Sequence, residues 1–256
     1  MSFKVFFAIF FTLLCNYGYS QQSISIDYKI TFYKNELDYS NLTQKQKDSK
    51  YMLQAKEAFE GAIDILNTLK THLIASRKKA KYWGDNTMPN DVNTLHFNLA
   101  KVMVENDKRY YYDIDSGIIS KWFKIFGSSF IMEQSVSGFN WRLMNESKQI
   151  GGYTCYKAEC SYQVVNSEGT FTKKVIAWYA PEISFMYGPK GFCGLPGLIL
   201  ELKDDKIKYM AENITFYNEK VEIESPPKAK VVTQKELDGL VEIAREERRL
   251  RLKKKE

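Results

Sequence analysis

The segment Gly188–Leu202 (GPKGFCGLPGLILEL) has four glycines and two prolines in its first ten positions. Glycine-rich loops can cradle a phosphate, because backbone N–H groups approach an anion closely where no Cβ intervenes. A phosphate-binding P-loop needs Lys and Ser or Thr directly after its last glycine, whereas Leu198 and Ile199 follow Gly197. A dinucleotide fingerprint would lead into a helix, but a strand-like apolar run follows here. The segment therefore predicts a tight turn or a loop that approaches a ligand.

The string Leu195-Pro196-Gly197 suits a type II turn, in which proline sets φ and glycine supplies the positive φ of the next position. Such a turn would lead directly into a central strand. If the segment instead covers a cavity, its glycines would let the backbone come close to a ligand or partner. The candidate binding loop then consists of Gly188, Pro189, Gly191, Phe192, Gly194, Leu195, Pro196 and Gly197.

Other catalytic patterns are missing from the sequence. The two histidines, His72 and His96, stand outside any H-E-x-x-H motif, and no G-x-S-x-G nucleophile elbow occurs. Asp204 and Asp205 form an acidic pair, but they lie in an expected hairpin turn, where solvation accounts for them. The sequence therefore predicts no catalytic residue, no metal site and no cofactor, and it favours a binding or structural protein over an enzyme.

Three of the four cysteines lie beyond the first 20 residues: Cys155, Cys160 and Cys193. Their spacing matches no C-x-x-C redox or zinc pattern. Cys155 and Cys160 are five apart on an expected strand, so they face opposite sides and cannot form a disulfide with each other. Any intrachain bridge would therefore include Cys193. We favour Cys160 as its partner, because Cys160 shares the more apolar side of the strand, and Cys155 is the alternative.

Hydrophobic periodicity predicts the elements that would position these residues. Ser23–Tyr33 alternates apolar and polar residues and predicts a half-buried strand that opens the domain. Apolar residues then recur in steps of three and four, which predicts one long amphipathic helix over 43–82, with His72 on it. We expect this helix to pack on the open face of a sheet. Its apolar stripe consists of Met52, Ala55, Phe59, Ala62, Leu66, Leu69 and Leu73.

Most of the remaining chain predicts strands. Residues 94–104, with His96, and 109–114 flank the turn ENDK and predict a hairpin. Short turns rich in Gly, Asn or Asp connect several later strands, and sequential connections of this kind build an antiparallel sheet. These later strands are expected over 128–134, 138–144, 154–165, 170–180, 198–203 and 208–218.

The C-terminal segment predicts a linker and a final helix. Residues 224–232 (ESPPKAKVV) suit a rigid extended linker, and Thr233 with Glu236 forms a capping-box pattern. The helix is expected to end in the basic run Arg245–Lys255, which either frays in solvent or contacts anionic lipid headgroups at a membrane surface. Its one apolar face would be formed by Leu237, Leu240, Val241 and Ala244.

The first 20 residues have the pattern of a secretory signal peptide. After a positive start, Val5–Leu14 forms a ten-residue apolar core that is too short to span a bilayer. Gly18 and Ser20 are small residues that suit cleavage before Gln21. Lipid attachment to Cys15 is the alternative, which the large residue before it disfavours. We therefore expect an exported protein.

The charge of the chain is concentrated at its C-terminus. Without the first 20 residues, the net charge of the chain falls from +6 to +5. The last twelve residues contribute +4 of this charge, and the folded body is therefore close to neutral. A neutral body argues against a nucleic-acid-binding face.

The residues around the glycine-rich segment resemble a known family. Gly194–Ile199 spells GLPGLI, and FNWRLMNESKQIGGYTCYKAE and AWYAPEISFMYGPKGF are similar to two further stretches of the GLPGLI family, exported proteins of Gram-negative bacteria. The resemblance covers about Phe139–Tyr209. It implies a periplasmic or outer-envelope protein with a fold similar to periplasmic lipoprotein carriers, and it brings no catalytic residues. Cys160, Cys193 and the long helix depart from the family pattern, and the cysteines suggest a disulfide.

We therefore expect an α+β fold, with an antiparallel sheet curved into an open barrel, a long amphipathic helix after the first strand and a short C-terminal helix. The expected domains are a signal peptide over 1–20, a single GLPGLI-like domain over 21–232 with 43–82 as a helical insertion, and a C-terminal helix with a basic tail over 233–256. The expected function is binding of an apolar ligand or an envelope protein partner, through an aromatic-lined sheet and the candidate loop. A purely structural protein without a cavity is the alternative, and an uncharacterised enzyme is the second.

Overall fold

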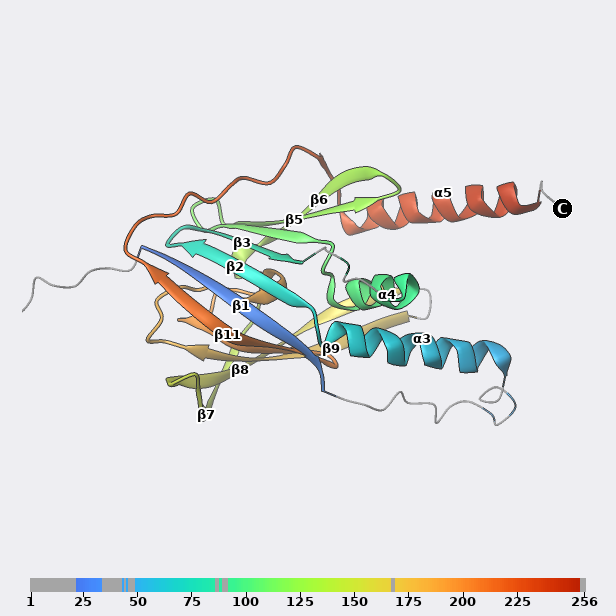
Figure 1. The fold of residues 1–256 in the computed structure, drawn as a ribbon. Helices are drawn as coiled ribbons and strands as arrows, with labels where there is room; N and C mark the ends of the chain where they lie inside the picture. The colour runs from blue at the N-terminus through green and yellow to red at the C-terminus, as the bar shows by residue number, and fades with distance from the viewer. Residues whose placement is uncertain are drawn as a thin grey trace, which may run out of the picture.

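The structure, a computed structural model, describes residues 22–33, 43, 45, 49–85, 88, 92–166 and 169–253. The predicted signal peptide over 1–20 lies outside the described residues. One sheet of twelve strands forms the body, and three α-helices accompany it in the described chain (Figure 1). The predicted α+β class is therefore confirmed.

The strands are β1 Ser23–Phe32, β2 Lys70–Ser76, β3 Lys79–Gly84, β4 Arg109–Asp113, β5 Ile118–Ile125, β6 Ser128–Ser135, β7 Arg142–Ile150, β8 Tyr153–Asn166, β9 Gly169–Ala180, β10 Leu198–Asp204, β11 Ile207–Tyr217 and β12 Lys230–Val231. The helices are α3 Lys50–Leu66, α4 Thr94–Val104 and α5 Gln234–Lys253. In the sheet the order is β12-β6-β5-β4-β3-β2-β1-β11-β10-β9-β8-β7. Among these pairs only β12 with β6 is parallel.

The sheet is not closed or strongly curled, so the predicted open barrel is wrong. Even an open barrel needs a strongly curled sheet, and full closure would bring the two outermost strands together. The edge of β6 is instead occupied by β12, a strand of two residues that leads directly into α5. At the other end of the order, β7 pairs with β8. The two ends of the sheet thus have separate neighbours, and the antiparallel sheet itself is confirmed.

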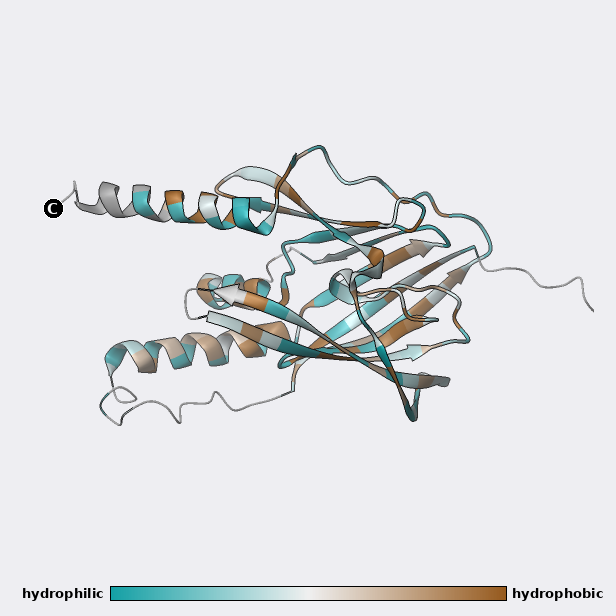
Figure 2. Ribbon diagram, turned by 180° about the vertical axis from the view of Figure 1, so that it is seen from behind, coloured by the Kyte–Doolittle hydropathy of each residue, from teal (hydrophilic) through white to brown (hydrophobic). Residues whose placement is uncertain are grey.

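The first strand is confirmed and lies at the centre of the sheet, between β2 and β11. The Tyr28 hydroxyl donates a hydrogen bond of 2.7 Å to the carbonyl of Ile199 in β10. Apolar residues concentrate along the central strands (Figure 2). The alternating residues that the sequence places on one face are all buried: Ile24, Ile26, Tyr28, Ile30 and Phe32.

The single long helix over 43–82 is wrong. α3 ends at Leu66, and residues 70–84 fold as the β2–β3 hairpin. A step of four residues, such as that from Leu69 to Leu73, fits both a helical period and a strand period of two, so the apolar stripe runs past the end of the helix. The strand period decides the fold of this part, because alternate residues are buried: Thr71, Leu73, Ala75, Ala80 and Tyr82.

Residues 94–104 form helix α4 and not the predicted strand. The side chain of Asn93 caps its N-terminus by accepting a hydrogen bond of 2.8 Å from the backbone N–H of Leu95. His96 therefore lies on a helix, and its ring packs so closely on Gly61 of α3 that any side chain at position 61 would collide with it. The buried residues of α4 have helical spacing: Phe97, Ala100 and Val104.

Five of the later strand predictions are confirmed by β6, β8, β9, β10 and β11, and the strand over 109–114 by β4. The strand predicted over 138–144 begins later, at Arg142, because a short 3-10 turn occupies Val136–Gly138. β5 was not predicted. Its sequence IISKWFKI places buried residues in pairs and not in strict alternation, and this hides the strand period.

The capping box of the C-terminal helix is confirmed. The Thr233 backbone N–H and hydroxyl both donate to Glu236 Oε2, at 2.7 and 2.9 Å. α5 is nevertheless longer than the short helix predicted, because it continues through the basic run to Lys253. Figure 1 shows that it extends beyond the end of the sheet. None of the helices in the described chain is long and apolar enough to cross a membrane.

Candidate functional site

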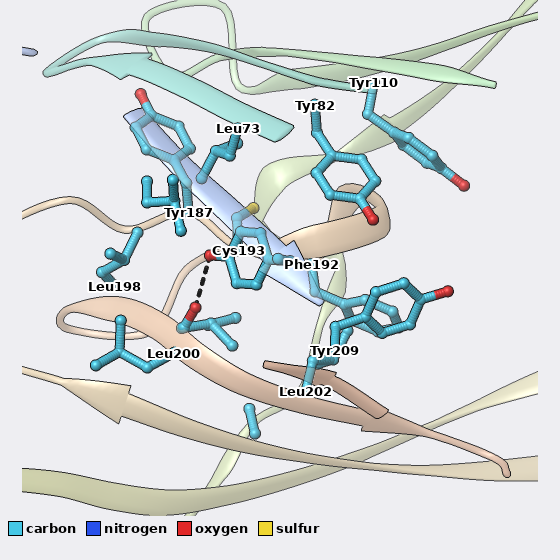
Figure 3. Packing of buried hydrophobic residues seen from close by; sticks show 14 of the residues in the cluster. Leu73, Tyr82, Tyr110, Tyr187, Phe192, Cys193, Leu198, Leu200, Leu202 and Tyr209 are labelled. Carbon is cyan, nitrogen blue, oxygen red and sulfur yellow. Dashed lines mark hydrogen bonds between the residues drawn. The ribbon is translucent and has the colours of Figure 1, made fainter. Parts of the chain in front are cut away.

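The glycine-rich segment lies inside the fold. Residues 181–197, here called the inner loop, connect β9 to β10 and reach across the sheet face to β3 and β4. In Figure 3 the labelled loop residues Tyr187, Phe192 and Cys193 lie between labelled residues of β2–β4 and labelled residues of β10–β11. The inner loop therefore fills the space between the two halves of the sheet. This position in the core explains why four glycines and two prolines, which restrict or release the backbone, occur together in one segment.

The eight residues of the candidate binding loop are thus largely internal. Six of them are buried: Gly188, Pro189, Gly191, Phe192, Leu195 and Gly197. The other two, Gly194 and Pro196, are exposed. The structure brings the eight together as one segment that packs on the core, and their role in binding a ligand or partner stays a prediction.

Tyr112 of β4 anchors the inner loop. Its hydroxyl donates a hydrogen bond of 2.6 Å to the carbonyl of Gly188 and accepts one of 2.9 Å from the N–H of Gly191. Its ring meets that of Tyr187 edge to face, with centroids 5.4 Å apart. One buried hydroxyl therefore satisfies two backbone groups that would otherwise lack partners in the core.

The type II turn predicted at Leu195-Pro196-Gly197 is wrong. The N–H of Gly197 donates to the carbonyl of Leu195 at 2.8 Å, which closes a three-residue turn. Gly197 has a φ of 155°, and a Cβ on it would lie 2.6 Å from the carbonyl carbon of Ala180 and 2.8 Å from Cα of Pro181. Glycine is thus required by the close approach of the backbone at the end of β9, and not by the predicted turn type.

Asp204 is not a solvated turn residue, as the sequence suggested. Its side chain is 5 % exposed, and it accepts hydrogen bonds from Lys190 at 2.6 Å and from the Tyr162 hydroxyl at 2.9 Å. Lys190 stands in the inner loop at a φ of 55°, a left-handed conformation that is uncommon outside glycine. Asp205, which follows Asp204 in the sequence, does lie at the surface, where it pairs with Lys173.

A second charged group lies close to this pair. Glu105, at the C-cap of α4, accepts a hydrogen bond from Tyr110 and pairs with Lys121 at 3.1 Å and Lys108 at 3.2 Å. Burial alone would raise the pKa of Glu105, but the charges of Lys190, Lys121 and Lys108 lower it well below its usual range. The charged side chains of the inner loop, α4 and β5 therefore form one cluster.

The charged cluster joins elements that are far apart in the chain and does not resemble a catalytic centre. Burial disfavours the charge of Lys190, but Asp204 and Glu105 outweigh burial and raise its pKa above the ordinary value. Lys190 therefore stays protonated and cannot serve as a general base near neutral pH. In the sequence, this buried cation is indicated only by a single lysine between two glycines of an otherwise apolar loop, and it was not recognised as such.

The predicted disulfide between Cys160 and Cys193 is absent, and all three described cysteines are free and buried. Cys193 Sγ lies 3.7 Å from the carbonyl of Val136, next to β6. Cys160 instead lies on β8 opposite Val175 of β9. The thiol of Cys193 thus contacts the backbone after β6, and it is joined neither to Cys160 nor to the alternative partner Cys155.

These thiols are expected to react slowly. Burial raises the pKa of Cys155 to about 11 and that of Cys160 and Cys193 to about 12, so almost no thiolate is present at neutral pH. A thiol-specific chromogenic disulfide should label none of the three rapidly in native protein and all three in denaturant. If only one of the three thiols is labelled in denaturant without a reductant, the other two are joined in a disulfide, and the free thiols described here are contradicted.

The two histidines lie on different elements, His72 on β2 and His96 on α4. His72 is on the outer face of β2, where Nδ1 lies 2.7 Å from Asp27 Oδ1 and Nε2 lies 3.0 Å from Asp85 Oδ1. Both ring nitrogens thus have carboxylate partners. Across the residues that the structure describes, no group of three or more His, Cys, Asp or Glu side chains is placed to hold a metal ion.

The predicted extended linker crosses the outer face of the sheet. Residues 218–229, here called the strap, run from β11 to β12. The backbone N–H of Val221 donates to the Ser23 hydroxyl at 2.7 Å, and Glu224 accepts from Lys81 at 2.5 Å. Near its end, Ala229 packs on a small cluster of Tyr111, Trp122 and Ile131. The strap is therefore fixed on β1, β3 and β6 in turn.

A pocket of about 200 Å³ lies between the strap and the sheet, and it is here called the strap pocket. Its floor belongs to β3–β6, and its cover is formed by residues 223–226 of the strap. Aliphatic, aromatic, hydroxyl and charged groups all take part. The lining residues are Lys79, Ala80, Tyr111, Tyr112, Asp113, Ser116, Ile118, Ser120, Glu133, Ile223, Glu224, Ser225 and Pro226.

Two carboxylates of the strap pocket are held in the ionised form. Burial would raise the pKa of Asp113, but the backbone N–H of Ser116 and the charge of Lys79 lower it. The hydrogen bond from Lys81 lowers the pKa of Glu224. The pocket therefore presents permanent negative charge near neutral pH. Sequence patterns do not reveal this pocket, because its lining residues come from β3, β4, the turn after β4, β5, β6 and the strap.

Comparison with known proteins gives one family and one fold. The family model described as a protein of unknown function, Porph_ging, matches residues 141–201. This segment runs from the start of β7 to β10 and includes Lys190 and the whole inner loop. No curated protein matches the chain.

Two solved structures resemble the chain at 12 % sequence identity. "Structure of PNGF-II in C2 space group" has a TM-score of 0.51 and covers 86 % of this chain and 32 % of its own. "Structure of PNGF-II in P21 space group" has a TM-score of 0.46 and covers 82 % and 32 %. This chain thus spans about a third of the length of PNGF-II. Residues 141–201 match the Porph_ging family of unknown function, and the fold is similar to part of PNGF-II.

Proposed function

We propose that this chain is an exported, non-catalytic binding protein of the cell envelope, of the GLPGLI type, and that its ligand occupies the strap pocket. The observation that carries the proposal is the pocket itself, which an anchored segment of the chain covers. Export is supported by the N-terminal sequence pattern, and the envelope location by the resemblance around the glycine-rich segment.

The size of the strap pocket limits the ligand to a small molecule. Its 200 Å³ correspond to roughly seven water molecules, at about 30 Å³ each. Drug-sized ligands occupy larger sites, from about 300 Å³ upward. The pocket therefore suits a molecule of one ring or a short chain.

The charge of the lining favours a cation over the apolar ligand that the sequence suggested. Lys79 is paired with Asp113 at 3.4 Å, and Glu224 is paired with Lys81. Glu133 lines the pocket as well, and it has no ion pair or side-chain hydrogen bond within the described part of the chain. An organic ammonium group would give Glu133 a partner, while Tyr111 and Ile223 offer apolar contact beside it.

The protonation states in the pocket support binding over catalysis. A general acid or base works best when its pKa lies near the working pH. The pKa values of Asp113 and Glu224 are lowered instead, so these carboxylates stay charged and keep their lysine partners, while Glu133 is left to receive a positive group. The buried charged cluster around Lys190 has its own partners and supports a structural role for the inner loop.

Titration with benzylammonium, followed by NMR of the backbone amides, tests the proposal. We expect shifts at Tyr111, Ser120 and Glu133 and a Kd of about 1 mM, as is typical for a fragment of this size. Benzyl alcohol has the same frame without the charge, and it should bind at least about fivefold more weakly, because it leaves Glu133 unpaired.

Two variants act as matched controls for this titration. Glu133→Gln should reduce benzylammonium binding to the level of the alcohol. Glu219→Gln lies outside the pocket lining and should leave binding unchanged. Equal binding of the two probes, or shifts confined to other parts of the sheet, would contradict the proposed site.

A further inference from the structure

The turn between β5 and β6 carries a residue that the fold does not explain. Phe126 and Gly127 connect the two strands, with φ values of 51° and 81°. A two-residue turn with positive φ at both positions is a type I′ turn, which favours Asn-Gly or Asp-Gly. Phenylalanine at its first position is a genuine outlier among non-glycine residues. The geometry of the turn therefore does not explain why position 126 is a phenylalanine.

The side chain of Phe126 gains nothing from packing either. It is 71 % exposed, and it is among the most exposed large apolar side chains of the described chain. A residue that is disfavoured by its backbone and not buried by its own fold is a candidate for contact with something outside the protein. Lys124, two residues earlier, is exposed as well, with its ammonium 5.6 Å from the Trp122 ring.

Helix α5 is the second feature on this side of the molecule. β12 pairs with β6 at Ile131, and α5 begins three residues after β12. Figure 1 shows α5 and the β5–β6 turn pointing in the same direction, with α5 reaching beyond the sheet. In its first half, hydrophobic residues alternate with hydrophilic ones (Figure 2). Ile243 there is 60 % exposed.

The second half of α5 is strongly basic in sequence. Residues 245–253 contain five Arg or Lys and two Glu, a net charge of +3. The rest of the mature chain is close to neutral, so this charge is a local feature of the helix. A helix whose first half mixes apolar with polar residues and whose second half is basic can lie on an anionic membrane, with its apolar side chains at the interface and its basic end among the headgroups.

We propose that α5 and the β5–β6 turn form one surface that binds an anionic phospholipid bilayer. Phe126 enters the interface between headgroups and acyl chains, where an aromatic ring is favoured. The basic residues of α5 and Lys124 stay among the anionic headgroups. Complementary charge favours an anionic bilayer as the partner, because a neutral partner would not account for the basic second half of α5. The inference is independent of the strap pocket.

Co-sedimentation with lipid vesicles tests this surface. We expect the purified protein to bind vesicles that contain phosphatidylglycerol, to bind phosphatidylcholine vesicles at least about tenfold more weakly, and to be released by added salt. Phe126→Asn is the decisive variant, because asparagine suits the left-handed turn better than phenylalanine does. It should keep or raise the melting temperature while it weakens vesicle binding about tenfold.

Charge reversal in α5 tests the electrostatic part. The double variant Arg248→Glu and Arg249→Glu should weaken binding to anionic vesicles by at least about 30-fold. The matched control is Lys78→Glu with Lys220→Glu, which changes the net charge equally at exposed positions away from α5 and the β5–β6 turn. This control should bind within about threefold of the unmodified protein.

Three results would overturn the surface. One is failure of the unmodified protein to bind anionic vesicles, and another is unchanged binding by Phe126→Asn. The third is equal loss in both charge-reversal variants, which would show attraction by net charge alone. A protein that binds no vesicle but captures a partner through the same residues counts against the lipid surface and leaves the strap pocket unaffected.

Discussion

Replacing Lys190 with methionine is expected to lower the free energy of unfolding by about 3–5 kcal/mol. Methionine matches the length of the lysine stem, but it leaves Asp204 without its cation, and the side chain of Asp204 is 5 % exposed. A buried carboxylate without a partner costs more than the pair itself contributes. Urea unfolding followed by far-UV circular dichroism measures the change.

Two further variants separate the charge from the packing. The double variant Lys190→Met with Asp204→Leu removes both charges, so it should regain much of the lost stability. Lys78→Met breaks an exposed pair, with side chains 68 % and 59 % exposed, and it should change stability by less than about 1 kcal/mol. If Lys190→Met unfolds at the same urea concentration as the unmodified protein, the pair does not hold the inner loop.

Gly197→Ala is expected to cost about 2–4 kcal/mol. The new Cβ would meet the backbone of Ala180 and Pro181, which cannot rotate away as a side chain can. Its φ of 155° is also a conformation that residues other than glycine rarely adopt. Thermal unfolding should show a melting temperature well below that of the unmodified protein.

The neighbouring glycine and a remote one complete this comparison. At Gly191, φ is 85° and a Cβ would lie 2.9 Å from the Tyr110 ring and 3.1 Å from the Gln134 amide. Alanine is therefore disfavoured there too, but the new Cβ meets side chains and not backbone, so Gly191→Ala should cost less than Gly197→Ala. Gly239→Ala in α5 meets nothing and should raise helix stability slightly. A Gly197→Ala protein that melts unchanged is incompatible with the backbone contact described here.

The strands with clean alternation were predictable from the sequence. β1 buries alternate residues from Ile24 to Phe32 on one face and leaves most residues of the other face half-buried, so a period of two is enough to find it. The boundary between α3 and β2 was not predictable in this way, because Leu69 and Leu73 satisfy both periods. α4 was mistaken for a strand because its many apolar residues suit either element, and Asn93 was not recognised as a helix cap.

The candidate sites were less accessible to sequence reasoning than the strands. Asp204 looks like a turn residue, and only the fold brings Lys190 of the inner loop to it. The strap pocket likewise forms because β12 docks beside β6, a pairing between residues 230–231 and 130–131. Local patterns carry no record of such distant pairings, so a site that depends on them emerges only from the assembled sheet.

The central position of β1 also orders the events of folding. β1 pairs with β11 in a register that joins Ser23 to Tyr217. One edge of the first strand therefore stays unpaired until the second-to-last strand has been synthesised. Contacts this distant in sequence make folding slow relative to proteins built from local contacts. As the ribosome releases the chain, the sheet cannot be completed before β11 emerges. The complete sheet is therefore expected to form only when nearly the whole chain has been synthesised.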